Sequence, residues 1–436
     1  MALMQPGDAV RRGQGPRPRL HGSPVAVSCS GLGSLGPPIP QRGLGRGLFE
    51  LLAAREPTPA LERRRRLAVM ARPRPHASDT RRHQSPRWWQ AWTAPSVPSH
   101  LLPTSVVGSH GLPGWVWLAR EALEAGRLGA LDVRELTEDA TQVALLDQER
   151  AGIDVLTTGE MTRVRFIIGF YSRFTGIRAL EAPRKLGQPL WDTNTPFEVV
   201  EKLSAPQGLG IVEEFALARR LTDQPLKATV PGPYTLMVPL KLAGGYKDKG
   251  SLLADLVAIV NAECRALAAA GADFIQIDEP HHGMYAGTVH DVTHGINEAV
   301  SGVRAKIAVH VCFGNLYGRP FSAVRDYRNL FPVLGDLAAS QVVLEFANKG
   351  LEDTARWQDW PKHLELGAGV IDVKAFKAET AEEVAERIRA LLRHIPAERL
   401  WLNPDCGFWE TPRWVVKHKL ASLVQGARIV RKELAG

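Results

Sequence analysis

Eight short apolar runs, separated by longer amphipathic segments, constrain the fold of this chain more than any other feature. In the longer segments, apolar residues return every three or four positions, as they do on one face of a helix. Buried parallel strands joined by helices produce this alternation, which is typical of a doubly wound sheet or a (β/α)8 barrel. The runs lie at residues 103–110, 153–160, 226–233, 273–280, 307–315, 341–348, 367–376 and 400–408.

The carboxyl ends of these runs decide between the two architectures. Each run ends in residues able to bind or react, except the third, which ends in a Pro-Gly-Pro turn. In a barrel these ends converge on one mouth, whereas an open sheet spreads them along an edge. We therefore predict an α/β protein with a (β/α)8 TIM barrel over residues 101–436, and loops and helices over 161–226 that cover the mouth. The polar residues are Ser109, Glu160, Asp278, Glu279, His310, Cys312, Glu345, Asp372, Lys374 and Cys406.

Four of these residues form a ligand set that suits Zn²⁺: His310, Cys312, Glu345 and Cys406. Residues two apart on a strand point to the same face, so His310 and Cys312 can reach one ion. Alone, this pair is equally typical of a buried structural cysteine near a histidine. The two further ligands at other strand ends favour a metal site, and their wide spacing indicates a reactive zinc rather than a zinc finger. Cys264, among alanines on a helical segment, is expected in the core.

Two acidic residues, Asp278 and Glu279, follow each other at the end of the fourth run. Adjacent residues on a strand face opposite sides, so they do not form a catalytic dyad that shares a proton. We expect one to face the mouth and the other to cap or pair with the wall. Together with Glu160, a mouth-facing Asp278 would make an anionic clamp for an ammonium group. The alternative is a set of structural ion pairs with Arg163 or Arg165.

The first 95 residues differ in composition from the rest of the chain. Residues 1–100 contain sixteen Arg, no Lys and five acidic residues, so the overall net charge of +8 comes from this region and the remainder carries −3. The region 1–95 is also rich in Pro and Gly, which predicts a disordered tail or a non-native extension. Binding of nucleic acid through Arg63–Arg66 and the nearby tryptophans is an alternative, as is a transit peptide; we favour neither.

Apolar run length and cysteine content indicate where in the cell the protein is located. The chain has no run of about 18 apolar residues, so no membrane span is expected. Its four cysteines in 436 residues favour a reducing compartment, where isolated thiols serve catalysis or metal binding. We expect a cytoplasmic protein.

Eight motifs follow one another along the chain: LLPTSVVGSH, TTGEMTRVRF, ATVPGPYTL, ADFIQIDEP, HVCFGN, VVLEF, GAGVIDVKAF and LNPDCGF. In this order they resemble the catalytic C-terminal barrel of cobalamin-independent methionine synthase, in a short, single-barrel form. The resemblance implies a zinc-dependent methyltransferase of methionine biosynthesis that activates homocysteine or a similar thiol as a thiolate. It implies Zn²⁺ ligands at His310, Cys312, Glu345 and Cys406, and substrate-binding residues at Ser109, Glu160 and Asp278.

Two departures from that family concern the methyl donor. The stretch ATVPGPYTLMVPL lacks the tryptophan that stacks on the pterin, and Lys374 stands where full-length enzymes carry a histidine. We expect Asp278 and Lys374 to be catalytic, with Lys374 as the acid that assists the leaving group. Glu345 is the expected labile ligand, because a carboxylate is the least soft donor of the four. The donor is either a methylated folate or a methylcorrinoid protein.

Two other functions fit parts of the pattern. An alkyl transferase of the epoxide:coenzyme M type also uses a zinc-bound thiolate in a similar barrel, but the acidic clamp disfavours a thiol that is anionic and lacks an amine. A non-catalytic zinc-binding barrel would leave that clamp without a purpose.

Overall fold

The computed structural model describes residues 100–124, 126–163, 168–183, 195–282, 286–315, 326–351, 353–409 and 411–436. They belong to one compact unit of the chain. The tail predicted for residues 1–95, including Cys29, lies outside the described residues. Among the helices that are described, none is both long enough and apolar enough to cross a membrane.

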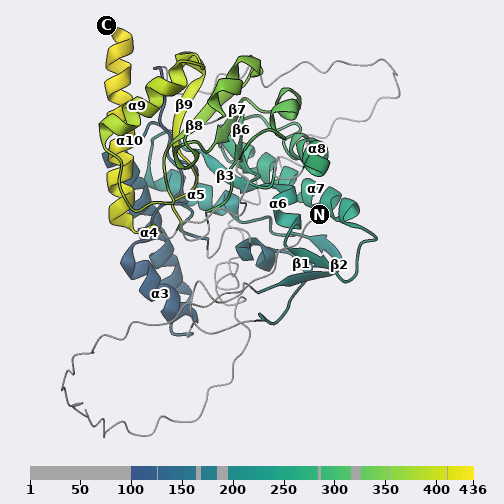
Figure 1. Cartoon of the computed structure of the whole chain (residues 1–436). Coiled ribbons are helices and arrows are strands. Elements are labelled where there is room, and N and C mark those ends of the chain that lie inside the picture. Colours follow the sequence, from purple (N-terminus) through teal and green to yellow (C-terminus); the bar gives the residue numbers. More distant parts are fainter. Residues whose placement is uncertain are drawn as a thin grey trace, which may run out of the picture. The chain divides into compact units, whose positions relative to one another are not determined.

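A six-stranded parallel sheet forms the centre of the described fold, in the order β3-β5-β6-β7-β8-β9 (Figure 1). Its strands coincide with predicted apolar runs, and nearly every residue in them is buried. Their bounds are β3 Ala228–Pro231, β5 Phe274–Asp278, β6 Lys306–Val311, β7 Gln341–Leu344, β8 Glu365–Ile371 and β9 Leu400–Pro404.

The first two apolar runs close this sheet into a ring through isolated parallel bridges. Residues 103–110 lie between β9 and residues 153–160, and the latter pair with the residues just before β3. All eight runs therefore follow one another around the ring in chain order, which confirms the predicted (β/α)8 barrel. The bridges join Thr104 to Leu402, Ser105 to Val155, Ser109 to Gly159, and Leu156 to Leu226.

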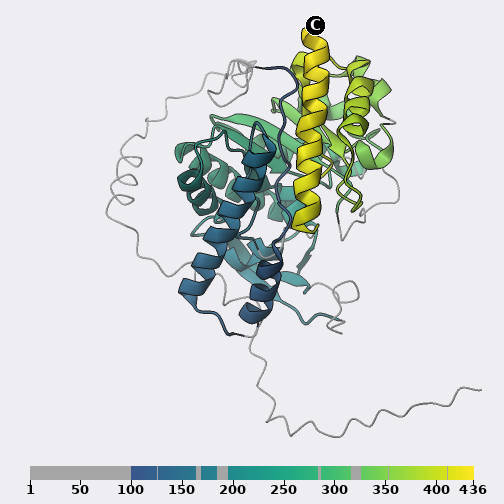
Figure 2. The same cartoon turned by 90° about the vertical axis from the view of Figure 1, so that its left-hand side faces the viewer.

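Helices pack against the outer face of the ring. In Figure 1, α9 and α10 lie side by side, and Figure 2 shows α10 running along α4. The start of α9 is set by a capping box, in which the Thr380 hydroxyl accepts from the Glu383 N–H and the Glu383 carboxylate accepts from the Thr380 N–H. The helices are α3 Gly114–Glu124, α4 Ala130–Ala151, α5 Ile211–Leu221, α6 Pro233–Met237, α7 Lys249–Ala269, α8 Val289–Ala299, α9 Ala381–Leu392 and α10 Arg413–Ala435. Short 3-10 helices are η2 Ile168–Arg173, η3 Ala286–Thr288, η4 Phe331–Asp336, η5 Ala347–Lys349, η6 Thr354–Asp359 and η7 Ala397–Arg399.

The strands bury both faces. Their outer face and the helices share one large apolar core, which includes Cys264 of α7, as predicted. A separate apolar cluster is drawn only from the strand runs and fills part of the barrel interior. Its members are Val107, Val155, Phe274, Ala308, Val343 and Trp401.

The insertion between the second and third runs differs from the prediction. It contains α5, as the expected helices require, but also an antiparallel hairpin of β1 Thr175–Ala179 and β2 Phe197–Ser204. A parallel strand, β4 Leu240–Leu242, extends this hairpin into a second sheet. The sequence did not indicate these strands because β2 is mostly half-buried or exposed, and one of its two partners, β4, lies about forty residues further along the chain. Coverage of the mouth by this insertion stays a prediction.

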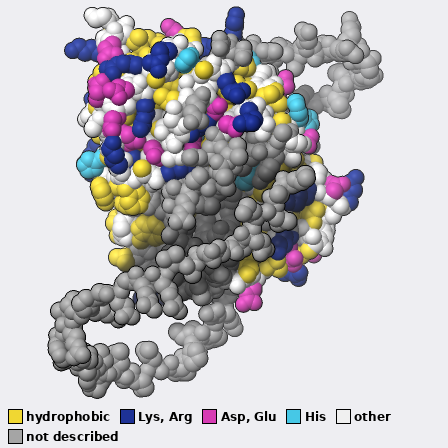
Figure 3. Space-filling view, in the orientation of Figure 1, with side chains coloured by type: hydrophobic (Ala, Val, Ile, Leu, Met, Phe, Trp, Pro, Cys, Tyr) yellow, Lys and Arg dark blue, Asp and Glu magenta, His cyan; other side chains and the backbone are white. Residues whose placement is uncertain are grey.

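The face shown in Figure 3 carries basic and acidic side chains in close mixture over its described residues. This agrees with the small net charge of the chain beyond residue 100. Within the described part of that face, no broad patch of basic side chains is seen.

Candidate metal and substrate site

Three of the four predicted metal ligands meet inside the barrel mouth. His310 lies on β6, Cys312 follows that strand and Cys406 follows β9. One ligand atom from each lies within 4.8 Å of the others, and the two Sγ atoms are 3.5 Å apart. A tetrahedral zinc with bonds of about 2.3 Å to sulfur holds two sulfurs roughly 3.8 Å apart. Since β7 and β8 separate β6 from β9 in the sheet, only the curvature of the barrel brings these residues together.

Two atoms of this site have no hydrogen-bond partner among the described residues although they are buried. They are Nε2 of His310 and Oε1 of Glu345. A buried polar atom without a partner costs about 1–3 kcal/mol, so native structures rarely leave one in place without a reason. Both atoms belong to predicted ligands, and a cation bound by the cluster of His310, Cys312 and Cys406 would satisfy Nε2 of His310. The residues present therefore fit Zn²⁺.

The other ring nitrogen of His310 is engaged. Its Nδ1 lies 3.0 Å from Oδ1 of Asp278 at the end of β5. A carboxylate that accepts from Nδ1 leaves the Nε2 lone pair free, which is the arrangement that metal-binding histidines usually show. Although burial opposes it, the contacts with Asp278 and Cys406 raise the pKa of His310 to about 9, so a bound metal ion would take the place of the proton on Nε2.

The two thiols are not equivalent. The contact with Cys312, helped by His310 and Lys374, holds the pKa of Cys406 well below its usual range despite burial. The same contact, together with burial, raises the pKa of Cys312. Cys406 is therefore the member of the pair that ionises first.

Glu345, the fourth predicted ligand, lies outside the three-residue cluster. Its Oε2 accepts from Nζ of Lys374 at 2.8 Å and from the backbone N–H of Phe313 at 3.3 Å. Both side chains of the Glu345–Lys374 pair are almost fully buried. Although burial opposes it, Glu345 and nearby anionic groups raise the pKa of Lys374. An ammonium stabilised in this way is a weaker acid, so the contact favours an anchoring role for Lys374.

Asp405 was not among the predicted site residues, yet it organises two ligand-bearing loops. Its carboxylate accepts from the backbone N–H groups of residues 346–348, just after Glu345, at 2.7–2.9 Å. It is also the neighbour of Cys406 in the chain. A Cβ at Gly369 would lie 2.7 Å from the Asp405 Cα, so only glycine permits this approach. Its place in a Pro-Asp-Cys-Gly turn was the available sequence signal.

Glu160 is held at the end of the second run by an ion pair. Its Oε1 accepts from Nη1 of Arg163 at 3.0 Å and from the Thr229 hydroxyl at 2.8 Å. The ion pair considered as the alternative to an ammonium clamp is thus present. Glu160 also has φ of 57°, a backbone strain that functional sites often contain. Asp278 lies close enough to help raise the pKa of Glu160, so the two predicted clamp residues act on one another.

Ser109 and Glu279, the remaining predicted residues, contact different parts of the barrel mouth. The Ser109 hydroxyl accepts from the N–H of Trp409 at 3.0 Å, which puts it against the loop that carries Cys406. Glu279 turns away from Asp278 and caps α6, where it accepts from the Tyr234 N–H at 3.1 Å. Adjacent carboxylates on opposite faces are what the strand geometry predicted.

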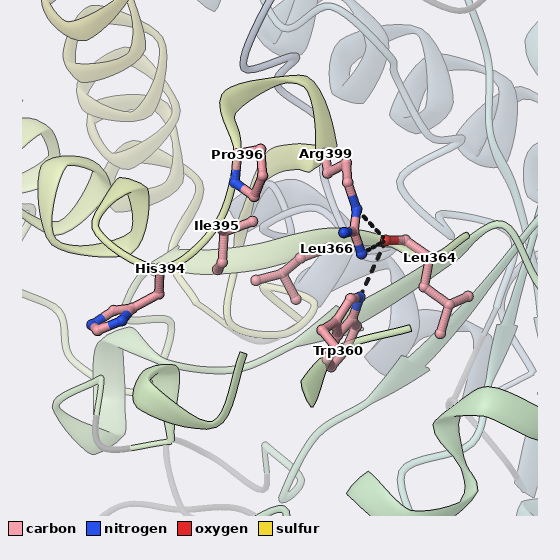
Figure 4. Close-up of a pocket in the computed structure, with 7 residues that line it drawn as sticks. All are labelled: Trp360, Leu364, Leu366, His394, Ile395, Pro396 and Arg399. Atoms are coloured by element: carbon pink, nitrogen blue, oxygen red, sulfur yellow. Dashed lines mark hydrogen bonds between the residues drawn. The ribbon is translucent and has the colours of Figure 1, made fainter. Parts of the chain in front are cut away.

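A small pocket lies at the opposite end of the barrel, beside the first residues of β8 and β9 (Figure 4). Its polar lining groups hold the wall together: Arg399 and Trp360 both donate to the carbonyl of Leu364. The arrangement is structural and is remote from the ligand cluster.

The sequence and the fold of this chain are both similar to those of known proteins. Residues 102–429 match the family model described as cobalamin-independent synthase, catalytic domain. A methionine synthase from Sulfurisphaera tokodaii is 35% identical over 77% of this chain and 94% of its own length. One from Thermococcus kodakarensis is 36% identical over 77% and 95%. A solved B12-independent methionine synthase from Shewanella sp. W3-18-1, in complex with selenomethionine, is 29% identical with a TM-score of 0.67, covering 77% of this chain and 99% of that one.

Proposed function

Since this chain belongs to the cobalamin-independent methionine synthase family, we propose that residues 101–436 transfer a methyl group to the sulfur of homocysteine and so form methionine. The observation that carries the proposal is the cluster of His310, Cys312 and Cys406, with Nε2 of His310 buried and unpartnered. The Shewanella relative was solved with selenomethionine, the selenium analogue of methionine, which supports a thioether product. Free cysteines at the site favour a cytoplasmic location.

We propose that His310, Cys312, Cys406 and Glu345 hold Zn²⁺. When bound, this ion stabilises a substrate thiolate at neutral pH, where a free thiol with a pKa near 8.5 is mostly protonated. The protein contributes the rest: Cys312 and Cys406 anchor the site, and Asp278 orients His310. Lys374 engages Glu345, the proposed labile ligand, and so favours a position left open to the substrate sulfur.

The amino-acid end of homocysteine is assigned to Glu160, Asp278 and Ser109. Glu160 and Asp278 supply two carboxyl groups on neighbouring parts of the mouth, and an ammonium group is the natural partner for them. Ser109 lies beside the Cys406 loop, where its hydroxyl can meet the substrate's polar end. Holding both ends of a short substrate restricts the sulfur to one direction of attack, which is a large source of rate.

The acidic clamp predicts a pH dependence. Burial raises the pKa of Glu160 to about 7, Arg163 opposes the rise, and Asp278 and Glu214 add to it. An ammonium binds the ionised carboxylate, so kcat/KM for homocysteine should be highest above this pKa and fall about tenfold per pH unit below it. The measurement is a pH profile with zinc in excess. Glu160→Gln should raise KM and abolish this step; an unchanged profile in the variant would refute the assignment of Glu160.

The methyl donor is tested separately from the acceptor. The purified protein is assayed for zinc content and for methionine formation from homocysteine, with methyltetrahydrofolate and with methylcobalamin in parallel reactions. Bound zinc with methionine formed from at least one donor supports the proposal, and the donor that works separates a folate from a corrinoid enzyme. Full zinc occupancy without methionine from either donor would reject the proposed reaction.

A further inference from the structure

A chain of hydrogen bonds runs through the barrel interior and ends at the proposed metal ligand His310. It begins at Lys227, whose Nζ donates to Oε1 of Gln276 at 2.6 Å. Nε2 of Gln276 donates to Oδ1 of Asp278 at 2.7 Å, and the same Oδ1 lies 3.0 Å from Nδ1 of His310. Lys227 and Gln276 are fully buried, and Asp278 and His310 are nearly so.

The groups in this series of hydrogen bonds allow only one orientation of the Gln276 amide, with its nitrogen as donor toward Asp278. Nε2 of Gln276 also donates to the carbonyl of Val107 at 2.8 Å, so both of its hydrogens are used. Reversing the amide would place its oxygen against two acceptors, the Val107 carbonyl and Asp278. It would also remove the oxygen that accepts from Nζ of Lys227. The Val107 carbonyl and Asp278 thus fix the orientation of the Gln276 amide, Nζ of Lys227 holds the amide oxygen, and the amide holds the carboxylate of Asp278.

Through Asp278, the direction of these hydrogen bonds decides which nitrogen of His310 carries the proton. A carboxylate only accepts hydrogen bonds, so Asp278 accepts from His310 as well as from Gln276, and a neutral imidazole carries its proton on Nδ1. In that form the lone pair is on Nε2, the buried atom without a hydrogen-bond partner among the described residues, whose residue clusters with the two thiols. We propose that Lys227 and Gln276 are positioning residues for the metal centre, which hold Asp278 and thereby aim Nε2 of His310 at the ion. This inference rests on the proposed zinc site.

A second buried lysine, Lys306, allows the proposed role of Lys227 to be separated from the effect of burying any lysine in the barrel. Lys306, on β6, is almost as buried and pairs with Glu365 at 2.5 Å. It also lies over the ring of Trp401 at 4.2 Å. Glu365 begins β8, at the end of the barrel away from the ligands. Lys306 is therefore a control: a buried barrel lysine beside the same Phe274 ring as Lys227, whose hydrogen-bond partner does not contact His310.

The test measures zinc affinity by competition with a chromophoric chelator, for the full-length protein and three variants. Lys227→Met removes the first donor. The double variant Lys227→Met/Gln276→Met replaces both members of the Lys227–Gln276 hydrogen bond with apolar groups of similar size, and it also takes the Gln276 donor away from the Val107 carbonyl and from Asp278. Lys306→Met is the control. Thermal unfolding of each variant confirms that it is folded.

We expect both Lys227 variants to bind zinc about tenfold more weakly, the lower end of the effect reported for groups that support metal ligands. Lys306→Met should bind zinc like the wild type, whatever its stability. Unchanged zinc affinity in the folded double variant would overturn the inference, as would an equal loss in Lys306→Met. Absence of zinc binding by the wild-type protein would instead reject the proposed metal site itself, so the two failures are distinguishable.

Discussion

Cys406→Ala is expected to abolish both zinc retention and methyl transfer. An apparent zinc-binding free energy of about 10–16 kcal/mol, shared among four ligands, assigns roughly 2.5–4 kcal/mol to each, or about 10²–10³-fold in affinity. Cys406 is also the thiol whose pKa is held well below its usual range, so its loss removes the ligand that is most readily a thiolate. Zinc content after dialysis and the initial rate of methionine formation measure the two effects.

Cys264→Ala is the matched control for this experiment. Cys264 is as buried as a cysteine can be, but it lies in α7 within the apolar core. Its replacement should lower stability modestly and leave zinc content unchanged. If Cys406→Ala retained stoichiometric zinc and full activity, the proposed metal centre would be wrong.

Lys374→Met should impair homocysteine use without weakening zinc binding. The substitution leaves the buried carboxylate of Glu345 without its cation, and loss of one partner of such a pair costs about 3–5 kcal/mol. A freed Glu345 competes with the substrate sulfur for the metal, so kcat/KM for homocysteine should fall by roughly 10²-fold or more. Zinc affinity should stay the same or rise, in contrast to Cys406→Ala. The exposed Lys377 offers a control as Lys377→Met.

The methyl donor separates this anchoring role from the predicted acid role of Lys374. The nitrogen that leaves methyltetrahydrofolate needs a proton, whereas the cobalt that leaves methylcobalamin does not. An acid therefore matters only for the folate, while an anchor for Glu345 matters for both donors. A loss confined to the folate reaction, or a fall in zinc affinity like that of Cys406→Ala, would contradict the anchoring role.

The periodicity of the sequence was sufficient for the eight strand–helix units, since strand and helix patterns are local properties of the chain, and the polar residues at the carboxyl ends of the strands favoured the barrel over an open sheet. It was not sufficient for the β1-β2-β4 sheet, because β2 has little regular alternation and pairs with β4, some forty residues further along the chain. The ligand residues were recognisable because His310 and Cys312 share a strand face and the other two stand at strand ends. Gln276 gave no signal, because a polar residue inside an apolar run has no evident partner until the barrel is closed.

Residue type and local spacing determined which groups this protein brings to its mouth: two thiols, an imidazole and several carboxylates at the ends of parallel strands. Only the tertiary structure decided what each group does there. It turned Glu345 toward Lys374, Asp278 toward His310, and Glu279 away to cap α6. These contacts join residues that lie tens of positions apart, such as Cys312 and Cys406. They exist because a closed ring of strands converges at one end, a constraint that no local stretch of sequence contains.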